Sequence, residues 1–171
     1  MIIAISGLTG SGKNTLGEQL AKALGLKLVC PTFKDLAKRE GISLMDFQKR
    51  AEKDPNIDKK FDAELKVQAK GNCVVTTWLG PWMVNADLRV YVFAPLDVRA
   101  ERVAKRDGIS VKDATKHIIE RDERNRKRYL KVYGIDIYDT SNFDVCISNE
   151  TFSKEQTRDA ILEIIKIREL K

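Results

Sequence analysis

A glycine-rich stretch near the start of the chain contains the residue types that bind phosphate. It reads Gly-Leu-Thr-Gly-Ser-Gly-Lys-Asn-Thr over residues 7–15, directly after an apolar run at 2–5 and directly before a helical pattern of leucines. Glycines let successive backbone N–H groups curl around an anion, the helix N-terminus adds partial positive charge, and Lys13 brings a fixed cation to the β- and γ-phosphates. This context predicts binding of a nucleoside triphosphate rather than a turn that only caps a helix.

The position after the lysine departs from the usual phosphate-loop pattern. Ser or Thr normally stands there and holds Mg²⁺ through its hydroxyl, whereas this chain has Asn14, followed by Thr15. We therefore predict that Thr15 supplies the hydroxyl for the metal.

Arginines recur at helical spacing in the second half of the chain. Two sets each share one helix face: Arg99, Arg102 and Arg106, and Arg121, Asn125 and Arg128. Phosphoryl transfer needs such groups, because guanidinium forks hold phosphates in line and neutralise the charge of the transition state. The alternative is a solvated face with surface ion pairs to Asp122 and Glu123, worth about 0–1 kcal/mol each. Two such sets in a chain with a phosphate loop favour the functional interpretation.

The positive charge is concentrated in the same region. The chain carries a net charge of +6, and residues 99–128 contain eleven Lys/Arg against six Asp/Glu. A local surplus indicates a local anionic ligand. Because no aromatic residue is available for base stacking in this stretch before Tyr129, phosphates of a small molecule explain the charge better than nucleic acid.

The elements around these residues alternate between strand and helix. A chain of 171 residues fits one domain, large enough to bury about 70% of the surface of the unfolded chain. Apolar or alternating runs predict strands at 2–5, 26–30, 72–77, 88–94 and 143–147. Helices are predicted from the phosphate loop to Gly25, over 33–70 with breaks near Gly41 and at Asp54-Pro55, over 96–105 and 111–132, and from a capping box at Ser153. The pattern predicts an α/β fold with a doubly wound, mainly parallel five-stranded sheet flanked by helices.

Composition sets the remaining expectations. The apolar run at 2–5 is too short for a signal peptide or a membrane span, so we expect a cytoplasmic protein without a membrane partner. Cys30, Cys73 and Cys146 are far apart and in apolar surroundings, which predicts buried free thiols rather than disulfides or a zinc site. His117, the single histidine, is expected at the surface.

Several motifs together resemble one family. The loop is similar to that of the nucleoside monophosphate kinases, a P-loop NTPase group, and Arg-Asp-Glu-Arg-Asn-Arg-Lys-Arg at 121–128 resembles the arginine-rich lid of cytidylate kinases. The segments 94–102 (Ala-Pro-Leu-Asp-Val-Arg-Ala-Glu-Arg), 133–137 (Tyr-Gly-Ile-Asp-Ile) and 139–141 (Asp-x-Ser) are similar to archaeal cytidylate kinases. The resemblance covers nearly the whole chain. It implies an ATP-dependent, Mg²⁺-requiring kinase of CMP or dCMP.

The resemblance also implies residue roles and a division of the domain. ATP and its metal would contact the loop at Gly7, Gly10, Ser11, Gly12, Lys13, Asn14 and Thr15, with Arg106 in the lid over the donor. The acceptor would contact Lys34, Trp78, Arg121, Asn125 and Arg128, and Lys13, Arg121 and Arg128 would act in catalysis. The core would comprise residues 1–30, 71–98 and 143–171, with an acceptor-binding insertion at about 33–70 and a lid at about 99–131. We expect a monomer.

The acceptor side departs from the family pattern. Members usually carry an arginine after Phe33 and an acidic-Gly-Arg triplet at the end of the third strand, whereas this chain has Lys34 and Thr76-Thr77-Trp78. Lysine lacks the bidentate fork, and tryptophan replaces a guanidinium with a flat apolar ring. Trp78 and Trp82 are consistent with either an aromatic platform for a base or packing at the strand end.

Two other functions therefore stay open. One is a kinase on the same scaffold with another small-molecule or nucleotide acceptor. The other is an RNA-associated ATPase or a regulatory nucleotide-binding protein that keeps the phosphate loop without the acceptor site.

Overall fold

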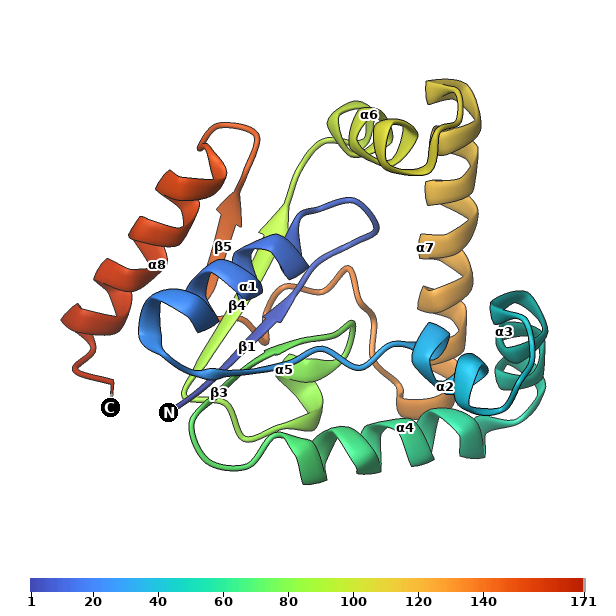
Figure 1. The fold of residues 1–171 in the computed structure, drawn as a ribbon, viewed down its shortest axis with the longest axis horizontal. Helices are drawn as coiled ribbons and strands as arrows, with labels where there is room; N and C mark the ends of the chain where they lie inside the picture. The colour runs from blue at the N-terminus through green and yellow to red at the C-terminus, as the bar shows by residue number, and fades with distance from the viewer. Residues whose placement is uncertain (171) are drawn as a thin grey trace.

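A computed structural model describes residues 1–170 as five strands and eight helices (Figure 1). The strands are β1 (Ile2–Ser6), β2 (Lys27–Val29), β3 (Cys73–Thr76), β4 (Leu88–Phe93) and β5 (Val145–Ser148). The helices are α1 (Lys13–Leu24), α2 (Phe33–Arg39), α3 (Leu44–Lys53), α4 (Pro55–Gln68), α5 (Gly80–Met83), α6 (Leu96–Asp107), α7 (Val111–Tyr133) and α8 (Lys154–Ile167).

All five strands lie in one parallel sheet, in the order β2-β3-β1-β4-β5. β1 is central, and its Ile3 lies opposite Val74 of β3 and Leu88 of β4. After β1 the chain forms the edge strand β2 and then β3, which fills the place between β2 and β1, whereas β4 and β5 extend the sheet on the other side of β1. The direction in which strands are added therefore changes beside β1. In sheets of this kind a ligand binds in the crevice outside the carboxyl ends of the strands at that reversal. The doubly wound α/β prediction is confirmed, and the sheet is parallel throughout.

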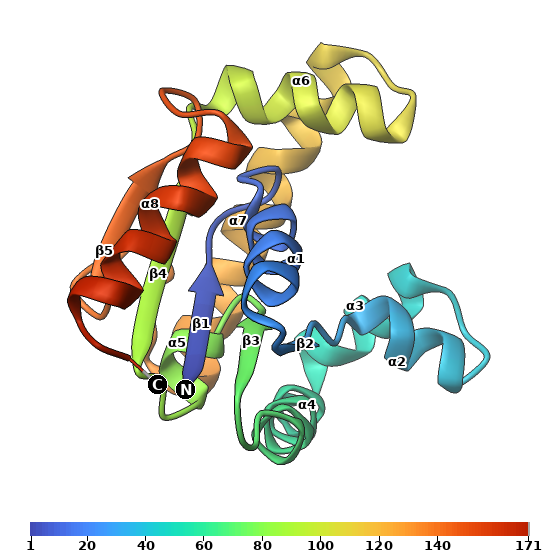
Figure 2. The same ribbon diagram turned by 60° about the vertical axis from the view of Figure 1, so that its left-hand side comes forward.

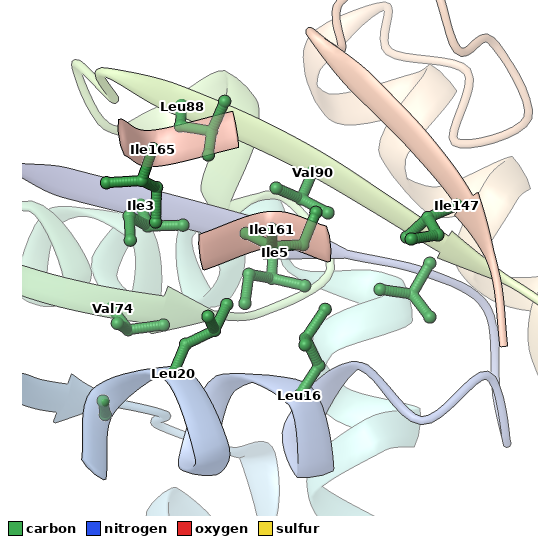
Figure 3. Close-up of a cluster of buried hydrophobic side chains, with 12 residues drawn as sticks. Ile3, Ile5, Leu16, Leu20, Val74, Leu88, Val90, Ile147, Ile161 and Ile165 are labelled. Carbon is green, nitrogen blue, oxygen red and sulfur yellow. The ribbon is translucent and has the colours of Figure 1, made fainter. Parts of the chain in front are cut away.

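Each face of the sheet is covered by helices, as the continuous apolar strands require. One face packs on α1 and α8, and Figure 3 shows these side chains interdigitating: Ile3, Ile5, Val74, Leu88 and Val90 from the strands, with Leu16, Leu20, Ile161 and Ile165 from the helices. On the other face Ala4 and Val75 pack with Leu65 and Ala69 near the end of α4. The carboxyl end of β1 is therefore held rigidly where the phosphate loop begins.

Between β2 and β3 the chain forms three helices, with the predicted breaks. Thr32 and Ser43 cap α2 and α3 through their hydroxyls. Asp54 ends α3 and caps α4, and Pro55 stands at the first position of α4, where a missing N–H costs nothing. The short helix α5 follows Trp78 and was not predicted, because the strand-end motif Leu-Gly-Pro-Trp has no helical periodicity.

The helices α6 and α7 form the second helical arm: α6 lies beyond the carboxyl ends of the strands, and α7 runs from there down one side of the molecule (Figures 1 and 2). Gly108 ends α6 at a φ of +68°, and Ser110 caps α7 through its hydroxyl. The helix predicted over 96–105 extends two residues further, since Arg106 and Asp107 belong to α6. His117 is exposed on α7, as expected.

The cysteine prediction is partly wrong. All three are free thiols, but only Cys73 is buried. Cys146 is exposed because β5 is an edge strand, and Cys30 is half-buried at the end of β2. Among residues 1–170, none of the helices is long and apolar enough to cross a bilayer.

Candidate functional site

The phosphate loop connects β1 to α1 and leaves the start of α1 open. Gly12 precedes the helix at a φ of +91°, and no side chain caps the first turn. Gly10, at a φ of +78°, lies so close to α6 that a Cβ would stand 2.9 Å from the carbonyl oxygen of Arg99. The free N–H groups of the first turn and the absence of an acidic residue there suit an anion.

Lys13 is the first residue of α1 and follows directly after the glycines of the phosphate loop. Its Nζ lies 5.1 Å from the centroid of the Trp78 ring. Burial, followed by the charge of the nearby Arg121, lowers the pKa of Lys13 to about 8. Among residues 1–170 no carboxylate forms an ion pair with this ammonium group, and a bound phosphate would provide an anionic partner.

A buried ion pair ties the loop to the second helical arm. Arg99 of α6 donates through Nη1 to Asp122 of α7 at 2.7 Å and to the carbonyl oxygen of Thr9 at 3.0 Å. The backbone N–H of Thr9 donates to the other oxygen of Asp122 at 3.2 Å. We call Arg99, Asp122 and Thr9 the loop clamp. The contact ion pair of Asp122 is with Arg99 rather than with Arg121, so Arg99 is a structural rather than a phosphate-binding arginine.

One pocket, here called the central pocket, is lined by six of the predicted site residues. It lies between the phosphate loop, the helices that follow β2, the end of β3 and α7. The predicted residues that line it are Lys13, Asn14, Trp78, Arg121, Asn125 and Arg128. Within residues 1–170, Nε of Arg121 is buried and makes no hydrogen bond. A pocket with a half-buried lysine and an unsatisfied guanidinium is prepared for an anionic ligand.

Two further predicted residues, Lys34 and Arg106, lie beside this pocket. Lys34 is exposed on α2 and lines an adjoining outer hollow together with Arg106, and that hollow shares Arg121 and Arg128 with the central pocket. Arg106 forms an exposed ion pair with Asp107 at 2.7 Å. These two cations are therefore near the site without lying in the central pocket.

Gly12 and Thr15 open instead on a separate hollow beside the loop. Its walls include Arg102 and Asn149, and Arg102 donates to the side-chain and backbone oxygens of Asn149 at 2.8 and 3.0 Å. Asn149 in turn donates to the carbonyl oxygen of Ser11. Arg102 thus connects α6 to the loop after β5. Asn14 lines the central pocket, whereas Thr15 lines this separate hollow.

The two tryptophans do not form one platform. Trp78 lines the central pocket, whereas Trp82 packs its ring edge-on against Phe143 at a centroid distance of 5.1 Å. Only Trp78 is therefore placed to contact a ligand.

Sequence reasoning missed two carboxylates of the central pocket, Asp58 and Asp62 of α4. They are 2% and 6% exposed. Nε of Arg128 lies 3.4 Å from Asp58, and Tyr133 donates its hydroxyl hydrogen to Asp62. Burial raises the pKa of both groups, that of Asp58 to about 6. A signal was present, because 58, 61, 62 and 65 follow i, i+3, i+4, i+7 spacing and so place both aspartates on the apolar face of their helix.

The residues near the loop suit a magnesium ion carried by a nucleotide. Mg²⁺ keeps several waters and needs only one or two protein oxygens besides phosphate. Thr15 is an exposed residue, and Oγ of Ser11 and Oγ1 of Thr76 are buried without a hydrogen-bond partner in the described residues. Residues 1–170 contain no cluster of three acidic, His or Cys side chains that would hold a metal by themselves. The donor set therefore fits a metal that arrives with its phosphates.

The solved structures that share this arrangement of sheet, loop and helical arms include several kinases. A shikimate kinase from Aquifex aeolicus superposes with a TM-score of 0.60 at 23% identity, covering 99% of each chain. The fold class is therefore that of the P-loop kinases.

Sequence comparison identifies the family within this class. The model of the cytidylate kinase-like family matches residues 2–151. A cytidylate kinase from Pyrococcus horikoshii is 48% identical over 159 residues, 91% of this chain and 83% of that protein. One from Pyrococcus abyssi is 49% identical over 159 residues, 91% and 88% of the two chains. The chain belongs to the cytidylate kinase-like family.

Proposed function

We propose that this protein transfers the γ-phosphate of ATP to CMP or dCMP by direct in-line displacement, giving CDP or dCDP. The observation that carries the proposal is the convergence of Lys13, Arg121 and Arg128 on one pocket. Cations preorganised around a transferring phosphoryl group stabilise the charge of its transition state. The relatives named cytidylate kinase support the choice of acceptor.

We assign the donor to the phosphate loop. Gly7, Gly10, Ser11, Gly12 and Asn14 would surround the phosphates with backbone N–H groups, and Lys13 would contact the β- and γ-phosphates. Arg106 would cover the donor from the lid. Mg²⁺, held by the Thr15 hydroxyl and the phosphates, would neutralise part of the phosphate charge when bound.

The acceptor is assigned to the α7 side of the central pocket. Arg121 and Arg128 would hold the acceptor phosphate, Asn125 would contact the sugar, and Trp78 would form a wall. Lys34 would approach from the outer hollow. A general base is unnecessary, because the attacking oxygen belongs to a phosphate that is already ionised, so that positioning and electrostatics provide the catalysis.

The same proposal divides the domain into a core (1–30, 71–98, 143–171), an acceptor-binding insertion (33–70) and a lid (99–131). Closing the two helical insertions over the substrates would exclude water and suppress hydrolysis of ATP.

The test is phosphate transfer from radiolabelled ATP in Mg²⁺ to CMP, dCMP, UMP, AMP and GMP in separate reactions. We expect preferential labelling of CMP and dCMP. The Lys13→Ala variant should lose transfer, because it lacks the charge at the β- and γ-phosphates. Lys22→Ala, on the exposed side near the end of the same helix, is the matched control and should retain the wild-type rate.

Two results would contradict the proposal. Labelling of an acceptor other than a cytidine monophosphate would show a kinase with a changed acceptor. ATP hydrolysis stimulated by RNA, with no transfer to any monophosphate, would show a nucleotide-binding protein of another kind.

A further inference from the structure

The central pocket has an acidic end that the phosphate chemistry does not use. Asp58 and Asp62 line the pocket from one face of α4, with Phe61 between them in sequence. Carboxylates beside bound phosphates would repel them, and among residues 1–170 neither aspartate forms an ion pair with Lys13 or Arg121, so the phosphates belong at those two cations. Arg128 lies 3.4 Å from Asp58 and would serve both the acceptor phosphate and this carboxylate. A ligand that spans the pocket must therefore present anions at one end and hydrogen-bond donors at the other.

Asp58 has unused hydrogen-bonding capacity. Its Oδ2 is buried and accepts no hydrogen bond from any residue among 1–170. Nε of Arg128 lies 3.4 Å from this oxygen and forms an ion pair with it, but no hydrogen bond. Nη2 of Arg128 already donates to Asn125 and to the Tyr129 hydroxyl, at 3.1 Å each. A buried carboxylate oxygen without a donor is costly, and a donor supplied by a ligand would remove that cost.

Asp62 is held in place from behind. Tyr133, at the end of α7, donates its hydroxyl hydrogen to Oδ2 of Asp62. This bond fixes the direction of the carboxyl group while its side chain still lines the pocket. The 133–137 segment that carries the family resemblance thus supports a pocket residue on another helix.

Aromatic rings surround the acidic end. The ring of Phe33 makes edge contacts with Phe61 and Phe47, at centroid distances of 5.3 and 5.1 Å. Cζ of Arg128 lies 4.9 Å above the Phe33 ring. Flat apolar walls with convergent acceptors suit a planar heterocycle whose edge donates hydrogen bonds.

We propose that Asp58 and Asp62 read the base of the acceptor and select a pyrimidine with an exocyclic amino group over its oxo counterpart. The inference rests on the proposed function and assigns its specificity to α4. Asp58 accepts a hydrogen bond from an N–H of the amino group. Asp62, oriented by Tyr133, lies beside the same edge of the ring. Uracil would place a carbonyl oxygen against the Asp58 carboxylate, so that two acceptors would face each other and the buried oxygen would stay unpaired.

The test compares kcat/KM for CMP with kcat/KM for UMP in the wild type, Asp58→Asn and Asp62→Asn. Leaving a buried charged group without its partner costs enough to change the ratio about 10- to 100-fold. We expect the CMP preference of Asp58→Asn to fall by that amount, because the amide can donate to the carbonyl oxygen of uracil. The KM for ATP should stay at the wild-type value. Glu64→Gln removes one exposed negative charge from the same helix and is the matched control.

The ratio of kcat/KM for CMP to kcat/KM for UMP distinguishes two roles of Asp58: recognition of the base and positioning of Arg128. If Asp58 only positions Arg128 for the acceptor phosphate, both substrates weaken equally and the ratio stays within about twofold of wild type. That result in both variants would overturn the inference and leave the proposed function standing. Absence of transfer to any monophosphate by the wild type would end the proposed function and the inference together.

A change in the substrate, instead of in the protein, tests the same inference without any effect of a mutation on folding. Wild-type protein is assayed with a CMP analogue that carries hydrogen in place of the amino group. We expect kcat/KM about 10- to 100-fold below that for CMP, because no donor then reaches Asp58. An analogue that reacts as well as CMP would overturn the inference without any mutation.

Discussion

Lys13 and Arg128 differ in how the fold compensates their charges. Lys13 loses water to burial and lies near another cation, Arg121, so its pKa falls to about 8. Arg128 lies beside Asp58 and above the ring of Phe33, so its charge is already compensated in the free protein. At the residue scale, the site therefore holds one cation whose charge depends on pH near neutrality and one that is held in place by its neighbours.

The first prediction concerns the pH dependence of ATP use. The pKa of Lys13 is lowered to about 8, so the free enzyme loses this charge as the pH rises through 8. We expect kcat/KM for ATP to be flat below that pH and to fall by up to about tenfold per unit above it. Bound phosphate restores the proton, so kcat should fall only at higher pH. A kcat/KM profile that stays flat to pH 10 would show that the Lys13 ammonium is not required.

The second prediction concerns the fork of Arg128. Lysine at this position keeps the charge but lacks the paired N–H groups, so Arg128→Lys should lower kcat/KM for CMP about 10- to 100-fold. The KM for ATP should change little. Lys127→Ala, at an exposed position on the same helix, is the control and should behave as wild type. Unchanged turnover of the acceptor by Arg128→Lys would remove this residue from the acceptor site.

At the scale of elements, the loop clamp joins the phosphate loop to α6 and α7. Arg99 and Asp122 are 8% and 2% exposed, and they bond to both the N–H and the carbonyl oxygen of Thr9. The loop and the arginine-bearing helix α7 thus share one rigid connection. Their relative position, and with it the distance between Lys13 and Arg121, depends on this buried pair.

The third prediction tests the clamp by stability. Asp122→Asn leaves the buried Arg99 charge uncompensated, which should lower the free energy of unfolding by about 3–5 kcal/mol. Urea denaturation followed by circular dichroism measures this loss. Glu120→Gln, at an exposed site on α7, is the control. The double variant Arg99→Met with Asp122→Leu should regain most of the stability while the KM for ATP stays raised, since the Thr9 backbone has lost its partners. If it regains a wild-type KM as well, the clamp does not position the loop.

At the scale of the whole molecule, the central pocket lies where separate parts of the chain meet. The phosphate loop, the helices after β2, the end of β3 and α7 each contribute walls. A ligand that contacts all of these walls binds only the folded protein. Such binding shifts the unfolding equilibrium toward the native state and so stabilises the whole domain.

The fourth prediction uses this linkage. A bisubstrate analogue with adenosine and cytidine joined by five phosphates, at about 100 times its Kd, should stabilise the protein by about 2.7 kcal/mol. For a chain of this size that is a rise in Tm of about 5–10 °C. The rise should be much smaller in Lys13→Ala. Equal rises in the two proteins would show that the analogue does not use the phosphate loop.

Much of this architecture follows from local sequence signals. The glycines at 10 and 12 and the apolar run before them predicted the loop at the end of a central strand, and Arg106-Asp107-Gly108 predicted the break between α6 and α7. Helical spacing predicted that Arg121, Asn125 and Arg128 share one helix face. The structure confirms this, because all three side chains line the central pocket. These features depend on residues close together in the chain, where spacing determines direction.

Only the tertiary structure decided which charges meet. Arg99 has the same helical phase as Arg102 and Arg106, yet it pairs with Asp122, 23 positions away. Asp58 and Asp62 join Arg128 and Tyr133 across about 70 residues of chain. The sequence alone determined that this protein has a parallel sheet with a phosphate loop and phased arginines. Which carboxylates neutralise those arginines, and which remain free for a ligand, depends on long-range packing that brings whole helices together, and no local spacing contains that information.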